Sequence, residues 1–117
     1  MFYTYTQNNS GGAFIFRRKE GITHFVIIEA DSATDANSRA ERIGLYFGGE
    51  GDCACCGDRW YPFYSDVKGD RVPSVYGKRV TKASTAKSLE LHIKWMDNKP
   101  EVFVHYKSGR ILAAVTR

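Results

Sequence analysis

The residues from His24 to Glu29 form an almost continuous apolar run, which constrains the fold more than any other stretch of this sequence. A strand with so few polar side chains is covered on both faces, so a central strand of a sheet is predicted here. Covering it requires a packed core, and a chain of 117 residues with 43% hydrophobic residues can form one. We therefore expect a single domain over residues 1–117.

One helix is predicted directly after this strand. Ser32 is a suitable N-cap, with Asp35 three residues later, and Gly44 fits the position after the last turn, where φ is positive. Apolar residues recur between them at helical spacing: Ala33, Ala36, Ala40 and Ile43. The pattern predicts a helix over about 32–43 whose alanine face packs closely on the sheet.

Short runs of aromatic, β-branched or alternating residues predict the remaining strands, at 2–6, 13–16, 60–64, 89–95, 102–106 and 111–115. Pro62 restricts the strand at 60–64 to a sheet edge. A helix over 88–96 is the alternative for 89–95, because the apolar residues there also fit helical spacing. Residues 65–87 show turn residues without a sustained period and are predicted to form a long loop.

The predicted fold class is therefore α+β. We expect an antiparallel sheet of five or six strands, with one α-helix packed on one face and a Cys/Gly-rich loop at one end.

The net charge of +4 conceals an asymmetry. Residues 1–58 carry a balance of −3, and residues 59–117 carry +7. A basic half favours an acidic partner or nucleic acid, although a solvated basic surface gives the same count. No apolar run approaches the roughly 18 residues of a membrane helix, and the N-terminal residues lack a signal-peptide pattern. We therefore expect a cytoplasmic protein.

All three cysteines lie in one glycine-rich loop. Cys53 and Cys56 form a C-x-x-C-G knuckle with Cys55 between them, a spacing at which two thiolates could hold zinc. The other ligands would come from another subunit or from Asp58, His24, His92 or His105. Because no second cysteine pair exists, reduced and partly buried thiols are the alternative. A redox role is disfavoured, because the residues after Cys56 do not resemble the start of a helix.

Aromatic and basic residues predict a binding surface. An arginine beside a tryptophan combines a fork of donors with a stacking ring, as Arg59 and Trp60 would do. In the structural alternative Arg59 pairs with Asp58, and Trp60 caps the core. The residues predicted to bind are Arg59, Trp60, Tyr61, Tyr76, Lys78 and Arg79.

Two segments carry a resemblance: the opening FYTYTQNNSGG, from Phe2 to Gly12, and CACCGDRW, from Cys53 to Trp60. Together with neighbouring stretches over roughly the first two thirds of the chain, they resemble a family of small uncharacterised bacteriophage proteins. The resemblance implies a phage-encoded accessory protein that acts in the cytoplasm of an infected bacterium. It also implies that the loop cysteines belong to the family pattern.

Three functions from different classes follow. The first is a non-enzymatic binder that inhibits a host or antiviral-defence factor, either a protein or a nucleotide signal, and that could act as a homodimer. The second is a nucleic-acid-binding module that uses the basic half. The third is a cysteine-dependent enzyme. The sequence contains no paired carboxylates at a useful spacing, no H-E-x-x-H and no G-x-S-x-G, so the binder is expected.

Overall fold

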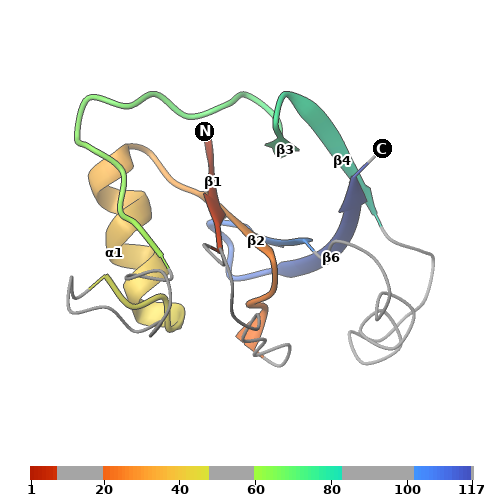
Figure 1. Cartoon of the computed structure of the whole chain (residues 1–117), viewed down its shortest axis with the longest axis horizontal. Helices are drawn as coiled ribbons and strands as arrows, with labels where there is room; N and C mark the ends of the chain where they lie inside the picture. The colour runs from red at the N-terminus through yellow and green to blue at the C-terminus, as the bar shows by residue number, and fades with distance from the viewer. Residues whose placement is uncertain (8–19, 48–59, 83–101, 117) are drawn as a thin grey trace.

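A computed structural model describes residues 1–7, 20–47, 60–82 and 102–116. The elements along the chain are β1 (Phe2–Thr6), β2 (Phe25–Glu29), α1 (Ala33–Ile43), β3 (Ser74–Val75), β4 (Lys78–Lys82), β5 (Val102–His105) and β6 (Ile111–Thr116) (Figure 1). Within these ranges, no helix is long and apolar enough to cross a membrane.

The strands form one curved, mixed sheet in the order β1-β2-β5-β6-β4-β3. β2 and β5 are parallel, with Phe25 opposite Val102 and Ile28 opposite His105, and the other neighbours are antiparallel. The α+β class with one helix is confirmed, but the prediction of a purely antiparallel sheet is wrong at the β2–β5 pair. A parallel pair needs a long connection, and here it runs through α1 and the β3–β4 hairpin. For the whole chain, the number of five or six strands stays a prediction, because two of the predicted strands, at 13–16 and 89–95, lie outside the described residues.

The helix and four of the strands lie where the sequence predicts them. Ser32 caps α1 by accepting the Asp35 N–H at 3.1 Å, and Gly44 ends the helix with φ of 120°. β2 is an interior strand, as its apolar run predicts, and β1, β5 and β6 confirm the predictions at 2–6, 102–106 and 111–115.

Two predictions are wrong. Trp60 to Tyr64 form no strand, because the backbone of Phe63 bonds to a side chain of α1 rather than to a strand. The loop predicted over 65–87 contains β3 and β4, which a two-residue turn joins. The predicted strands at 13–16 and 89–95, the alternative helix at 88–96 and most of the cysteine loop lie outside the described residues.

Two apolar clusters cover the two faces of the sheet. The helix-side cluster packs α1 and the chain after it on β1 and β2, and comprises Tyr3, Tyr5, Ile22, Val26, Ile28, Ala30, Ala33, Ala36, Ala40, Leu45 and Trp60. The inner cluster fills the concave face, and comprises Ile27, Val75, Val80, Val102, Val104 and Ala114. Successive β2 residues alternate between them, since side chains along a strand point to opposite faces.

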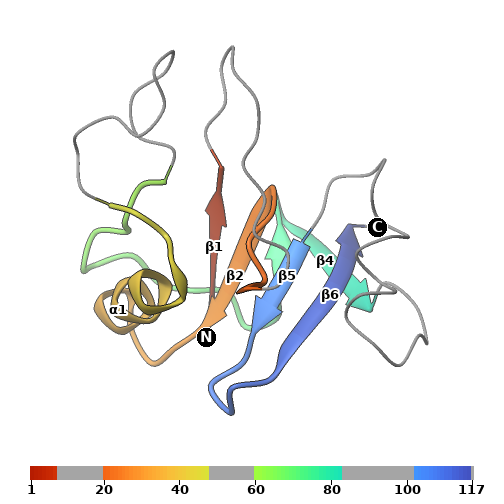
Figure 2. The ribbon, with the colours of Figure 1, turned by 90° about the horizontal axis from the view of Figure 1, so that it is seen from below.

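The sheet curves until its two end strands approach each other (Figure 1). Thr4 Oγ1 on β1 donates to the carbonyl of Ser74 on β3 at 2.6 Å. Phe2 and Asp70 exchange two backbone hydrogen bonds of 2.7 and 2.8 Å just before β3. Figure 2 shows β1, β2, β5 and β6 side by side, with α1 on the flank of β1. The inner cluster therefore lies inside a half-closed barrel, and α1 lies outside it.

Asn37 on α1 fastens residues 60–64 to the helix. Its side-chain oxygen accepts the Tyr5 hydroxyl at 2.7 Å and the Phe63 N–H at 3.0 Å, and its amide nitrogen donates to the Phe63 carbonyl at 2.8 Å. The Tyr5 ring packs between Phe47 and Phe63, with centroids 5.7 and 4.8 Å away. Burial, together with the nearby Tyr3, raises the pKa of the Tyr5 hydroxyl, which therefore stays a donor.

Replacing Asn37 tests this contact. Asn37→Ala removes three hydrogen bonds and leaves the Phe63 backbone unpaired, so we expect the free energy of unfolding in urea to fall by about 2 kcal/mol. Asn37→Asp keeps the acceptor oxygen but turns a second acceptor towards the Phe63 carbonyl, so it should also lose stability. The control Ser38→Ala, on the exposed side of α1, should stay within about 0.5 kcal/mol of the wild type. Equal effects of Asn37→Ala and Ser38→Ala would contradict this role.

His105 on β5 is buried and holds the turn that precedes β2. Its Nε2–H donates to the Gly21 carbonyl at 2.8 Å. Gly21 has φ of 72°, and a Cβ there would lie 2.8 Å from the imidazole, so only glycine fits. Burial lowers the pKa of His105 below its ordinary value of 6.5, assisted by the charge of Arg39 and opposed by the Gly21 hydrogen bond.

This lowered pKa makes stability depend on pH. In the unfolded chain the His105 imidazole takes up a proton below about pH 6.5, whereas in the folded protein it does so only at a lower pH. The free energy of unfolding should therefore decrease as the pH falls from 6.5 towards the pKa of the folded state. His105→Gln should show a smaller decrease in unfolding free energy over that window than the wild type. NMR titration of the wild-type imidazole measures the pKa directly. A His105 pKa at or above 6.5 would contradict the prediction.

Candidate functional site

The β3–β4 hairpin ends in a two-residue turn, Tyr76-Gly77. Both residues have positive φ, 50° and 77°, the signature of the type I′ turn that matches the twist of the strands. Asparagine and glycine adopt this conformation readily, but for tyrosine it costs about 1–2 kcal/mol. A residue held in such a conformation at the surface is a candidate for function.

The Tyr76 side chain projects from this turn and is 82% exposed. Its ring meets Phe25 on β2 edge to face, with centroids 5.8 Å apart and an interplanar angle of 89°. Phe25 in turn packs against the inner cluster, which contains Val75 at the base of the hairpin. The Tyr76 ring is therefore exposed to solvent on most of its surface, while its contact with Phe25 links it to the core.

The residues beside Tyr76 are basic. Lys78 begins β4, and Arg79 follows with an exposed side chain. Val80 faces the inner cluster, so alternation places Arg79 on the outer face of the sheet. Within the described part of the chain, Arg79 forms no ion pair. The nearest acid along the chain, Asp70, accepts a hydrogen bond from Ser74 Oγ at 3.1 Å. We call Tyr76, Lys78 and Arg79 the hairpin tip.

The structure divides the predicted binding residues between two places. Trp60 is 4% exposed and belongs to the helix-side cluster, so the alternative in which it caps the core describes its position. Tyr61, next to it, is 55% exposed. Figure 1 shows residues 60–64 beside α1 and the β3–β4 hairpin at the other end of the molecule. Arg59 lies outside the described residues, as do Cys53, Cys55 and Cys56.

No metal site is visible in the described ranges, where no group of three potential ligands gathers. Of the histidines proposed to complete a zinc site, His105 already uses Nε2 to bind Gly21. His24 lies before β2 and has interactions of its own. His92 and Asp58 lie outside the described residues. The zinc hypothesis for the cysteine loop therefore stays a prediction.

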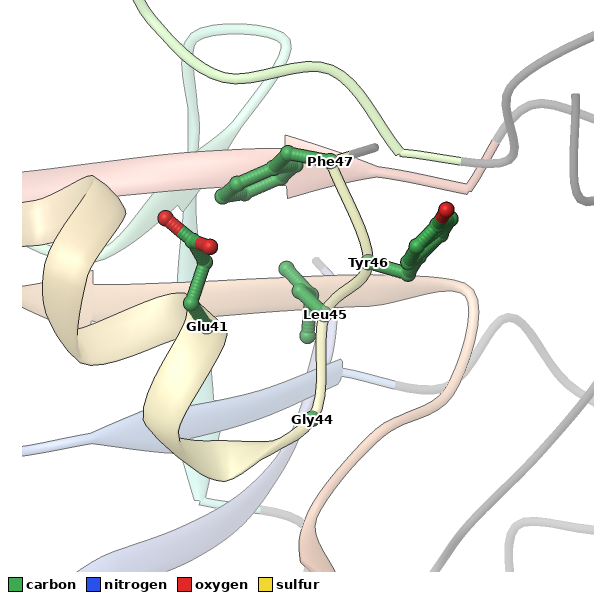
Figure 3. A pocket seen from close by; sticks show the side chains of 5 residues that line it. All are labelled: Glu41, Gly44, Leu45, Tyr46 and Phe47. Atoms are coloured by element: carbon green, nitrogen blue, oxygen red, sulfur yellow. The ribbon is translucent and has the colours of Figure 1, made fainter. Parts of the chain in front are cut away.

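An open pocket lies at the C-terminal end of α1, lined by Glu41, Gly44, Leu45, Tyr46 and Phe47 (Figure 3). Glu41 faces the Leu45–Phe47 stretch across it. Leu45 is buried, and Phe47 stacks on Tyr5 at 5.7 Å, so the floor is part of the core. Among the described residues that line this pocket, Glu41 is the one charged side chain, and a single carboxylate does not define a chemistry.

Sequence reasoning included Tyr76 but not the feature that makes it unusual. Its positive φ follows from the two-residue turn of the hairpin. The sequence has no Asn-Gly or Asp-Gly pair at this position, and such a pair is what usually predicts a turn of this type. Tyr64, 83% exposed, was likewise not predicted as a surface residue. A Tyr-Gly pair between short β-branched stretches was the available signal for the turn.

Comparison with known proteins places residues 1–115 in one family. The chain belongs to DUF7296, described as a domain of unknown function. No curated protein and no solved structure matches the chain.

Substituting Tyr76 tests whether its side chain contributes to the stability of the fold. Tyr76→Asn relieves the backbone strain but loses the Phe25 contact, so we expect the free energy of unfolding to change by less than about 1 kcal/mol. Gly77→Ala is the matched control: among the described residues no atom lies within 4 Å of the added Cβ, yet the positive φ should cost about 1 kcal/mol. A loss of 2 kcal/mol or more in Tyr76→Asn, roughly the size of a core defect, would identify Tyr76 as structural.

Proposed function

We propose that this chain is a non-enzymatic binding protein of bacteriophage origin that inhibits a host or antiviral-defence factor in the bacterial cytoplasm. The observation that supports the proposal is Tyr76: an aromatic ring 82% exposed, on a backbone with φ of 50°, over a fixed base. Backbone strain of this kind clusters at binding and active sites. The hairpin tip is therefore the proposed contact surface.

The composition of the hairpin tip fits binding better than catalysis. Tyrosine and arginine are enriched among the residues that dominate the energy of protein interfaces, where truncating one costs 2 kcal/mol or more, as a rule of thumb. Catalysis would need a base or nucleophile among them, and Tyr76, Lys78 and Arg79 include no histidine, cysteine or carboxylate.

Nucleic-acid binding is the second candidate. The basic balance of residues 59–117 supports it, as do Arg71 and Lys68, which are exposed on the segment between α1 and β3. Against it, Asp66 and Asp70 lie on the same segment, so this part of the surface carries no excess of positive charge.

A pull-down from host lysate with the tagged full-length protein tests the proposal. We expect one protein to be retained after nuclease treatment and at about 0.3 M salt, where phosphate contacts are strongly weakened. A second sample without nuclease shows whether nucleic acid accompanies it. Metal analysis of the purified protein tests the cysteine loop in the same experiment.

Recovery of nucleic acid alone, lost on nuclease treatment, would replace the proposal with the second candidate. Recovery of neither class would refute a protein target and nucleic acid alike, and would point to a small ligand such as a nucleotide signal. Retention of a single protein under all conditions would support the binder, and purification of that protein would then allow affinity measurements.

A further inference from the structure

We infer that the hairpin tip inserts Tyr76 into a narrow apolar pocket with an acidic rim on a folded protein partner. This inference rests on the proposed function and adds the chemistry and shape of the partner. Three features of the hairpin lead to it: the shape of the turn, its fixed base and the sign of its charges.

The shape favours a concave partner. A two-residue turn is the tightest connection between antiparallel strands, so the hairpin narrows to Tyr76 and Gly77. No atom of the described residues lies within 4 Å of the Cβ position of Gly77, so this part of the structure leaves the turn open on that side. A narrow projection of this kind buries its side chain only when the partner surrounds it.

The fixed base lowers the cost of binding. Tyr76 is held from below by Phe25, and β3 is tied to β1 through the 2.6 Å bond from Thr4 Oγ1 to the Ser74 carbonyl. Val80 N–H donates to the Pro73 carbonyl at 3.0 Å and closes the other end of the hairpin. Because the turn is already ordered, little conformational entropy is lost when Tyr76 enters a pocket.

The charges predict the rim. Lys78 and Arg79 follow the turn directly, and Arg79 has no ionic partner among the described residues. Asp70, the nearest acid along the chain, is engaged by Ser74 Oγ. A partner surface with carboxylates around the pocket would pair with these cations, whereas a basic rim would repel them.

A nucleic-acid strand fits the same site less well. One exposed ring offers about one base-stacking contact, and sequence-tolerant binding to a strand needs several rings along a positive track. The other strongly exposed tyrosine, Tyr64, lies on the segment beside α1, at the other end of the molecule (Figure 1). The observations therefore favour a protein pocket.

The test uses site-specific photo-crosslinking and measured affinities. p-Benzoylphenylalanine replaces Tyr76 in one sample and Tyr64 in the other, because the two side chains are equally exposed, at 82% and 83%. Probes are irradiated in host cells, and crosslinked peptides are mapped on the partner. With the purified partner, we expect Tyr76→Ala to weaken binding about 30-fold or more and Tyr76→Phe by less than about threefold.

Charge variants complete the experiment. Arg79→Ala should weaken binding several-fold at low salt and less at high salt, and Arg79→Glu more strongly at low salt. Tyr64→Ala is the control and should leave affinity within about twofold. Crosslinks from position 76 should map to an apolar pocket bordered by Asp or Glu.

Failure of the inference and failure of the proposed function are distinguishable. A retained protein partner whose affinity is unchanged in Tyr76→Ala, or whose crosslinks arise only from position 64, would overturn the inference and leave the binder standing. Crosslinks from position 76 to a basic surface or to nucleic acid would also overturn it. The absence of any protein partner in the pull-down would overturn the inference together with the proposal of a protein target.

Discussion

One side-chain amide joins the three parts of the helix-side layer. Asn37 belongs to α1, accepts the hydroxyl of Tyr5 on β1, and pairs with both backbone groups of Phe63. The Phe63 backbone thus obtains from a helix the two hydrogen bonds that a neighbouring strand would otherwise supply. With this segment fixed, Trp60 and Phe63 close the helix-side cluster, and the chain continues across the molecule to β3 at a defined place. The hairpin lies far from Asn37 and is held by its own contacts with β1 and β2.

The two layers meet in β2. Val26 and Ile28 face α1, and Ile27 faces the inside of the half-closed barrel, so both layers rest on one strand. The inner layer extends to Phe25 and from there to the exposed ring of Tyr76. Core packing and the proposed contact surface are therefore continuous.

Local signals in the sequence predicted local structure well. The serine cap, the alanine spacing and Gly44 located α1, and apolar runs located β1, β2, β5 and β6. They could not predict that Phe25 lies beside Val102, because no turn joins these strands and parallel pairing depends on distant residues. Residues 60–64 form hydrogen bonds with Asn37 instead of the predicted strand, and this contact also joins residues that are distant in the sequence. At the candidate site, composition indicated Tyr76 and Arg79 and offered the core position of Trp60 as an alternative, but the backbone strain at Tyr76 depends on the folded environment.

The parallel pair also bears on how the chain comes together during synthesis. β2 needs β5 as its neighbour, and 72 residues separate Glu29 from Val102. β2 therefore leaves the ribosome uncovered on one edge and one face, and the inner layer can form only when β4, β5 and β6 have also been synthesised. Contacts this distant in sequence make folding slow and leave apolar strand surface open to aggregation or to chaperones in the meantime.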